Sequence, residues 1–129
     1  MFSRYVLCLL LLLPLAVSAS NSVNLETTMK SMGLALKQAR EADSPQAATP
    51  YLSELTELTE QAKKARFPED KAQKYLEGLD KVLLALQQAQ EAAAADDSQR
   101  LQQALTEVEQ LRRHYHKQRK VSFWQILFG

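Results

Sequence analysis

Two kinds of side chain in this sequence could bind a transition metal ion, the imidazoles and the thioethers. The chain has two histidines, His114 and His116, which lie in the basic run LRRHYHKQRK at 111–120. Neutral imidazole is a common metal ligand, and the softer thioether of methionine prefers lower oxidation states. Whether these groups can share a site depends on the helix faces that carry them.

The segment that begins at Asp96-Asp97-Ser98 predicts a capped helix with one apolar stripe, and this stripe separates the two histidines. At about 100° per residue, with Val108 as zero, four apolar residues fall within about 60° of it: Leu101, Leu105, Leu111 and Tyr115. His116 falls near 80°, at the edge of the stripe, and His114 near 240°, toward solvent. His116 can therefore face the core, although a half-buried histidine that suits the helix dipole would show the same pattern.

Three earlier segments also repeat apolar residues at three-and-four spacing and are rich in helix-favouring residues. The first covers roughly 22–42, the second ends near Arg66 with a start that Pro50 leaves uncertain, and the third follows Phe67-Pro68. Asp43-Ser44-Pro45 marks the first connection. Short connections join antiparallel neighbours, so the sequence predicts an all-α, up-down-up-down four-helix bundle.

This topology brings the start of the first helix and the end of the fourth together. Met29 lies on the apolar stripe about one turn into the first helix, and His116 about one turn from the end of the fourth. A thioether that faces an imidazole across an apolar cleft is an axial pair for a low-spin, electron-transferring haem iron. Met32, one turn deeper, is a competing thioether, and either methionine could simply fill the core.

At these residues the sequence resembles the soluble cytochrome b562 family, periplasmic four-helix bundles that hold one non-covalent haem b. Leu25-Glu26-Thr27-Thr28-Met29 resembles the family's start, with Met29 at the axial methionine. Arg112-Arg113-His114-Tyr115-His116 resembles its end, with His116 at the axial histidine. Gly78-Leu79-Asp80 resembles a run that lines the haem pocket. The resemblance implies a periplasmic b-type cytochrome that carries single electrons.

The resemblance also implies further haem contacts. Tyr75 and Leu79 stand where the family commonly has phenylalanine, and Arg112 stands where covalent relatives carry cysteine. Lys120, next to Arg119, matches an arginine that approaches a haem propionate, and a lysine would keep its charge but lose the bidentate geometry. The expected haem-binding set ends with the two metal ligands: Leu25, Tyr75, Leu79, Arg112, Lys120, Met29 and His116.

The first twenty residues have the pattern of a secretory signal. Arg4, a long apolar run, Pro14 and the small residues Val17-Ser18-Ala19 follow one another. This order predicts a signal peptide at 1–19, cleavage after Ala19, export to the periplasm and a mature bundle at 22–120. The only cysteine, Cys8, lies within the signal, so the mature chain can form neither a disulfide nor a covalent haem link.

Charge and motifs argue against several functions. Without Arg4, basic and acidic residues are equal at 15 each, so global charge predicts no nucleic-acid binding. Because the sequence has no catalytic constellation or Gly-rich phosphate loop, we expect no enzyme activity.

The C-terminal tail suggests possible binding partners. The apolar tail 121–129 is too short to cross a bilayer but could pack on the bundle, lie on a membrane surface or dock on a partner. We expect a monomer with an unidentified redox partner protein. The alternative function is a cofactor-free periplasmic helical-bundle protein that binds clients in a chaperone-like stress response.

Overall fold

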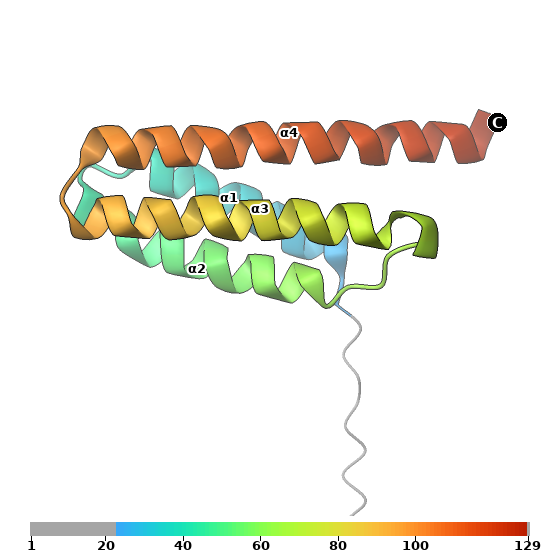
Figure 1. The fold of residues 1–129 in the computed structure, drawn as a ribbon, viewed down its shortest axis with the longest axis horizontal. Helices are drawn as coiled ribbons and strands as arrows, with labels where there is room; N and C mark the ends of the chain where they lie inside the picture. Colours follow the sequence, from blue (N-terminus) through green and yellow to red (C-terminus); the bar gives the residue numbers. More distant parts are fainter. Residues whose placement is uncertain (1–22, 129) are drawn as a thin grey trace, which may run out of the picture.

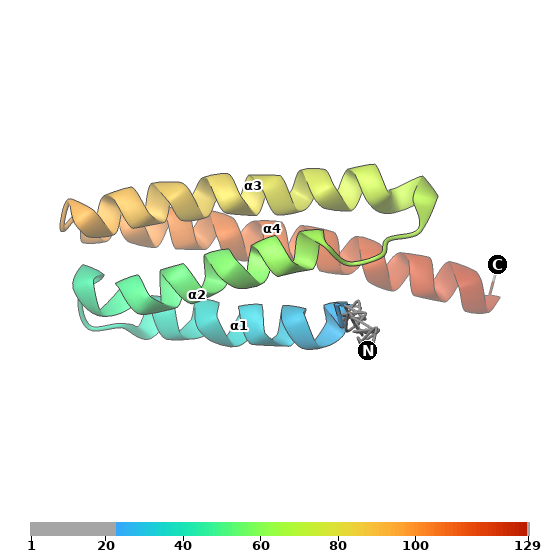
Figure 2. The same ribbon diagram turned by 90° about the horizontal axis from the view of Figure 1, so that it is seen from below.

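Four helices make up the part of the chain that the computed structural model describes, residues 23–128, with side chains for residues 23–117. They are α1 (Leu25–Glu41), α2 (Pro45–Lys63), α3 (Glu69–Ala94) and α4 (Ser98–Phe128). Successive helices run antiparallel and lie side by side (Figures 1 and 2). The predicted all-α four-helix bundle is confirmed, whereas the predicted signal peptide at 1–19 lies outside the described residues.

Side-chain caps begin three of the helices, as the sequence pattern predicts for the fourth. Asn24, Ser44 and Asp97 accept hydrogen bonds from the backbone N–H groups three residues later, each at 3.1 Å. The second helix begins at Pro45, where the missing N–H costs nothing. Pro50 lies inside that helix on its exposed side, so it does not set the start of α2.

The turn between α3 and α4 uses an aspartate in a left-handed conformation. Asp96 has φ 53°, and the N–H groups of Asp96 and Asp97 donate to the carbonyls of Ala93 and Ala92. This pattern closes the end of α3 in the way that a helix-terminating glycine usually does. The Gln46 amide donates to the Asp96 carboxylate at 3.0 Å, which ties the start of α2 to this turn.

Alanines are frequent in the core near the α1–α2 and α3–α4 turns. Near the α1–α2 and α3–α4 turns the buried side chains are mostly small: Ala35, Ala39, Ala48, Ala85, Ala89, Ala92 and Ala93. Small side chains let helix backbones approach closely. Toward the other end the core widens to leucines and valines, with Leu36, Leu55 and Val108 as buried members.

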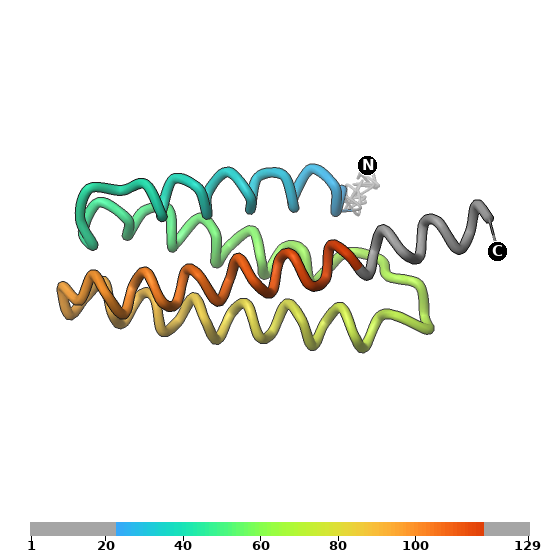
Figure 3. The backbone as a smooth tube through the Cα atoms, turned by 90° about the horizontal axis from the view of Figure 1, so that it is seen from above, coloured from blue at the N-terminus to red at the C-terminus, as the bar shows by residue number. Residues whose placement is uncertain are grey.

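The fourth side of the bundle is the least closely packed. α1 packs on α2, α2 on α3 and α3 on α4, but α1 and α4 make far fewer contacts with each other. The start of α1 lies at the same end of the bundle as the later part of α4 (Figure 3). The topology therefore brings Met29 and the histidine segment to one end, as the sequence predicts.

None of the four described helices combines the length and the apolar character needed to cross a bilayer. The backbone of α4 continues without a break beyond Lys120 to Phe128, so residues 121–128 extend this helix. Docking of the tail on a membrane or on a partner stays a prediction.

Candidate functional site

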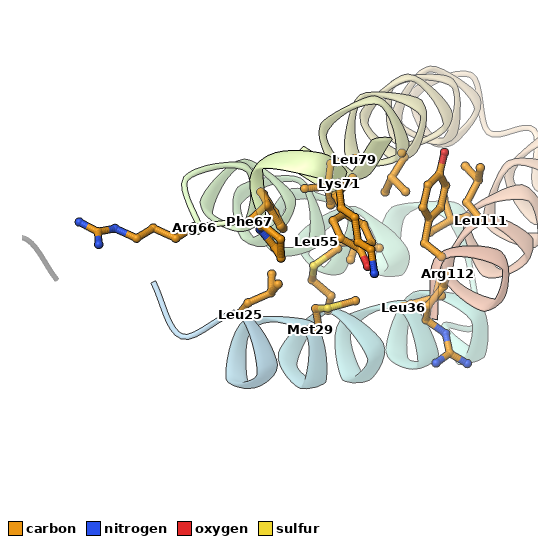
Figure 4. Close-up of a pocket in the computed structure, with 17 residues that line it drawn as sticks. Leu25, Met29, Leu36, Leu55, Arg66, Phe67, Lys71, Leu79, Leu111 and Arg112 are labelled. Atoms are coloured by element: carbon orange, nitrogen blue, oxygen red, sulfur yellow. The ribbon is translucent and has the colours of Figure 1, made fainter. Parts of the chain in front are cut away.

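An apolar pocket of about 430 Å³ lies at the wide end of the bundle and receives side chains from all four helices and from the α2–α3 connection (Figure 4). Its volume lies in the range of small-molecule and cofactor sites. The deepest lining residues are buried core members: Leu36, Leu55, Val82 and Val108. The pocket is thus the continuation of the core into the end where α1 and α4 separate.

Most of the site residues that the sequence predicts come together in this pocket. Two leucines, a tyrosine, an arginine and a thioether of that set line it: Leu25, Leu79, Tyr75, Arg112 and Met29. Met32 lines it as well, so the geometry presents both candidate thioethers. Of the run Gly78-Leu79-Asp80, the first two residues line the pocket, whereas Asp80 forms an ion pair with Lys63 of α2 at 2.7 Å.

The histidines do not line the pocket. His116 and His114 are both exposed, and neither is among the described lining residues. Tyr115 lines the pocket between them in sequence, and its ring meets the His114 ring edge-on at a centroid distance of 5.1 Å. The metal-ligand role of His116 therefore stays a prediction, and the side chain of Lys120 lies outside the described part of the structure.

Tyr115 lies directly against the backbone of α3 because residue 78 is a glycine. A Cβ atom added at Gly78 would be 2.5 Å from the Tyr115 Cζ and nearly as close to its neighbouring ring carbons. Such distances are far below van der Waals contact. Gly78 thus creates the space that the Tyr115 ring fills, a close approach that the apolar stripe of α4 alone could not have predicted.

One carboxylate holds both arginines of the predicted site segment. Glu109 accepts hydrogen bonds from Arg112 Nε and Nη2 at 2.9 and 2.8 Å and from Arg113 Nε at 2.9 Å. The hydrogen bonds from Arg112, and then the one from Arg113, lower the pKa of the Glu109 carboxyl to about 2. Arg112 is thereby held along the surface of α4, and its guanidinium points away from the pocket (Figure 4).

The sequence analysis missed the part of the site that the α2–α3 connection supplies. Arg66, Phe67, Pro68 and the first-turn residue Lys71 all line the pocket. The Phe67 ring packs against the Tyr75 ring, with centroids 5.4 Å apart. Phe67 was visible in the sequence as an apolar residue at a helix break, but no periodicity could show which way a connection folds.

Comparison with known proteins gives one informative result. The family model described as Cytochrome b562 matches residues 24–120, which is most of the chain. Neither the curated proteins nor the solved structures give a match. The matched region begins at the cap of α1 and contains every residue named in the pocket.

Two glycines offer a test of the Tyr115 contact. Gly78→Ala should destabilise the fold by about 1–3 kcal/mol, because the added methyl group overlaps the Tyr115 ring. Gly33→Ala in α1 meets nothing within 4 Å and should stabilise by about 0.5–1 kcal/mol through helix propensity. Urea unfolding followed by circular dichroism measures both, and equal effects would show that Tyr115 does not lie against Gly78.

Acid should weaken the Glu109 cluster. The carboxyl pKa of about 2 in the folded state lies below the usual value of about 4.3, so the stabilisation is complete above that value and is lost as pH falls toward 2. Because its arginine partners are exposed, Glu109→Gln should cost only about 1 kcal/mol at pH 7.

Urea unfolding at pH 7 and near pH 2 measures this difference, with exposed Glu107→Gln on the same helix as control. The cost of Glu109→Gln should nearly vanish at the lower pH. A cost that is the same at both values would contradict an ionic origin.

Proposed function

The chain belongs to the cytochrome b562 family, and from this premise we propose that it is a periplasmic b-type cytochrome that carries single electrons. The family implies a haem-binding helical-bundle cytochrome; one non-covalent haem per chain, held in the pocket, is our proposal. The family match carries it, and the pocket at the wide end of the bundle supports it.

The pocket has the chemistry that a haem requires. The macrocycle is a large apolar plate, and the lining is mostly leucine, valine, methionine and aromatic side chains. When bound, haem supplies an iron that changes oxidation state by one electron. The side chains of this chain would orient the group and exclude water from it, which sets the environment in which the iron is reduced.

We propose Met29 and His116 as the two axial ligands. Met29 already lines the pocket, and it points into it from α1 (Figure 4). His116 is exposed, so ligation requires its imidazole to turn inward while the Tyr115 ring leaves its place against Gly78. His116 lies one helical turn after the pocket-lining Arg112, so a rotation of the end of α4 would be sufficient.

Export, partner and assembly are also proposals. The predicted signal peptide and the family support a periplasmic protein whose mature chain carries no cysteine, which makes the haem non-covalent. We propose a monomer that exchanges electrons with a redox partner protein, with the tail at 121–129 as a contact for that partner or for a membrane surface. Enzyme activity is not part of the proposal, because cytochromes of this family are electron carriers.

The histidine assignment predicts different results for two neighbouring variants. His116→Ala should abolish the sharp low-spin bands of the dithionite-reduced, haem-loaded protein, because it removes the nitrogen ligand. His114→Ala should keep them, since this side chain is exposed and faces away from the stripe. Absorption spectra of both variants beside the wild type measure the effect. A spectrum that is broad and indifferent to both changes would favour the cofactor-free client-binding alternative.

The thioether assignment is tested by the two methionines of α1. Met29→Leu should convert the oxidised protein toward high spin and lower its midpoint potential, because a thioether ligand favours ferrous iron. Met32→Leu, a change of the same kind in the same pocket, should leave the spin state unaltered. Spectroelectrochemical titration distinguishes them, and the reverse pattern would assign Met32 as the ligand.

A further inference from the structure

The charged side chains among the described residues that line the pocket are of one sign. Three of the described lining residues are cationic, Arg66, Lys71 and Arg112, and none of the described lining residues is Asp or Glu. An apolar pocket with cations at its rim is complementary to an amphipathic ligand that carries negative charge at one edge.

Lys71 is the cation with the best position to use this complementarity. Arg112 is engaged by Glu109 on the surface of α4, and Arg66 points away from the pocket (Figure 4). Lys71 is half-buried, and its side chain runs from α3 over the pocket toward α1 (Figure 4). Its ammonium group can therefore reach a ligand within the pocket.

At Lys71 only the side chain, and not the backbone N–H, is placed to bind a ligand in the pocket. The N–H groups of Lys71 and Ala72 both donate to the Pro68 carbonyl, at 2.9 and 2.8 Å. They are therefore committed to closing the first turn of α3. Phe67 and Tyr75, packed on each other at this wall, give the apolar part of a ligand a surface next to the ammonium group.

We propose that Lys71 binds a carboxylate of the molecule that occupies the pocket. On the proposed function, on which this inference rests, that carboxylate is a haem propionate. Lys71 belongs to the first turn of α3, whereas Lys120, the residue of the expected propionate contact, belongs to α4. Lys71 would then favour binding of a macrocycle that carries a carboxylate at its edge over binding of the same macrocycle without that carboxylate.

The test compares haemin with its dimethyl ester, whose two carboxylates are masked. Both are titrated into the full chain without haem, and binding is followed by absorption. Lys71→Gln should weaken haemin binding about five- to tenfold, the loss of one partly solvated charge-assisted hydrogen bond, and should leave binding of the ester unchanged. Lys71→Arg should retain most of the affinity.

Lys74→Gln is the matched control, because Lys74 is exposed on the same helix and does not line the pocket. It should leave both affinities unchanged. Circular dichroism shows that each variant is folded. Should Lys71→Gln fail to fold, Lys71→Met takes its place, because it keeps the apolar stem of the side chain and removes only the charge.

Two results overturn the inference, and they are distinguishable. If Lys71→Gln weakens haemin and the ester equally, or behaves as Lys74→Gln does, Lys71 is not the carboxylate site although the haem proposal survives. If the wild type gives no low-spin complex with haemin at all, the proposed function fails together with the inference.

Discussion

Small side chains hold the four helices close together at one end of the bundle, and larger ones keep them apart at the other. The alanines of α1, α2 and α3 near the two turns are almost completely buried, so backbones approach there as closely as packing allows. At the other end, leucine, methionine and tyrosine side chains cannot fill the space between α1 and α4, which make few contacts. The pocket lies at the end where α1 and α4 pack least closely, and the proposals about its occupant depend on it.

Tyr115 partly fills the space between α1 and α4. Its contact with Gly78 accompanies the orientation of α4 about its own axis, which directs Tyr115 toward the pocket. The ring lies where only a glycine at residue 78 leaves room for it, so Tyr115 takes the inward direction and its neighbour His116 is exposed. Adjacent helical residues differ by about 100° in direction, and in this structure Tyr115 lines the pocket whereas His116 does not. The proposed ligand role of His116 would therefore require the Tyr115 ring to leave its place beside Gly78.

The charged side chains near the pocket come from two helices, α3 and α4. Glu109 lies between Arg112 and Arg113 on α4, and these hydrogen bonds fix both guanidinium groups along the helix. Lys71 reaches the pocket from the neighbouring helix α3, whose first turn is closed by hydrogen bonds to the Pro68 carbonyl. The two walls thus differ in chemistry. α4 contributes the guanidinium-bearing Arg112, which is bonded to Glu109 of the same helix, whereas the start of α3 contributes the ammonium group of Lys71.

The sequence by itself determined the helices, their order and the end at which the candidate ligands meet, because apolar spacing, caps and short connections are local properties. Met29 could be placed at this end for the same reason, whereas Tyr75, Leu79 and Arg112 were assigned to the site through the resemblance to the cytochrome b562 family. Only the tertiary structure decided that Tyr115 occupies the space beside Gly78, and that Phe67 and Lys71 form a wall of the pocket. A close approach between helices and the path of a connection depend on contacts between residues far apart in the chain, which no spacing within one helix can report.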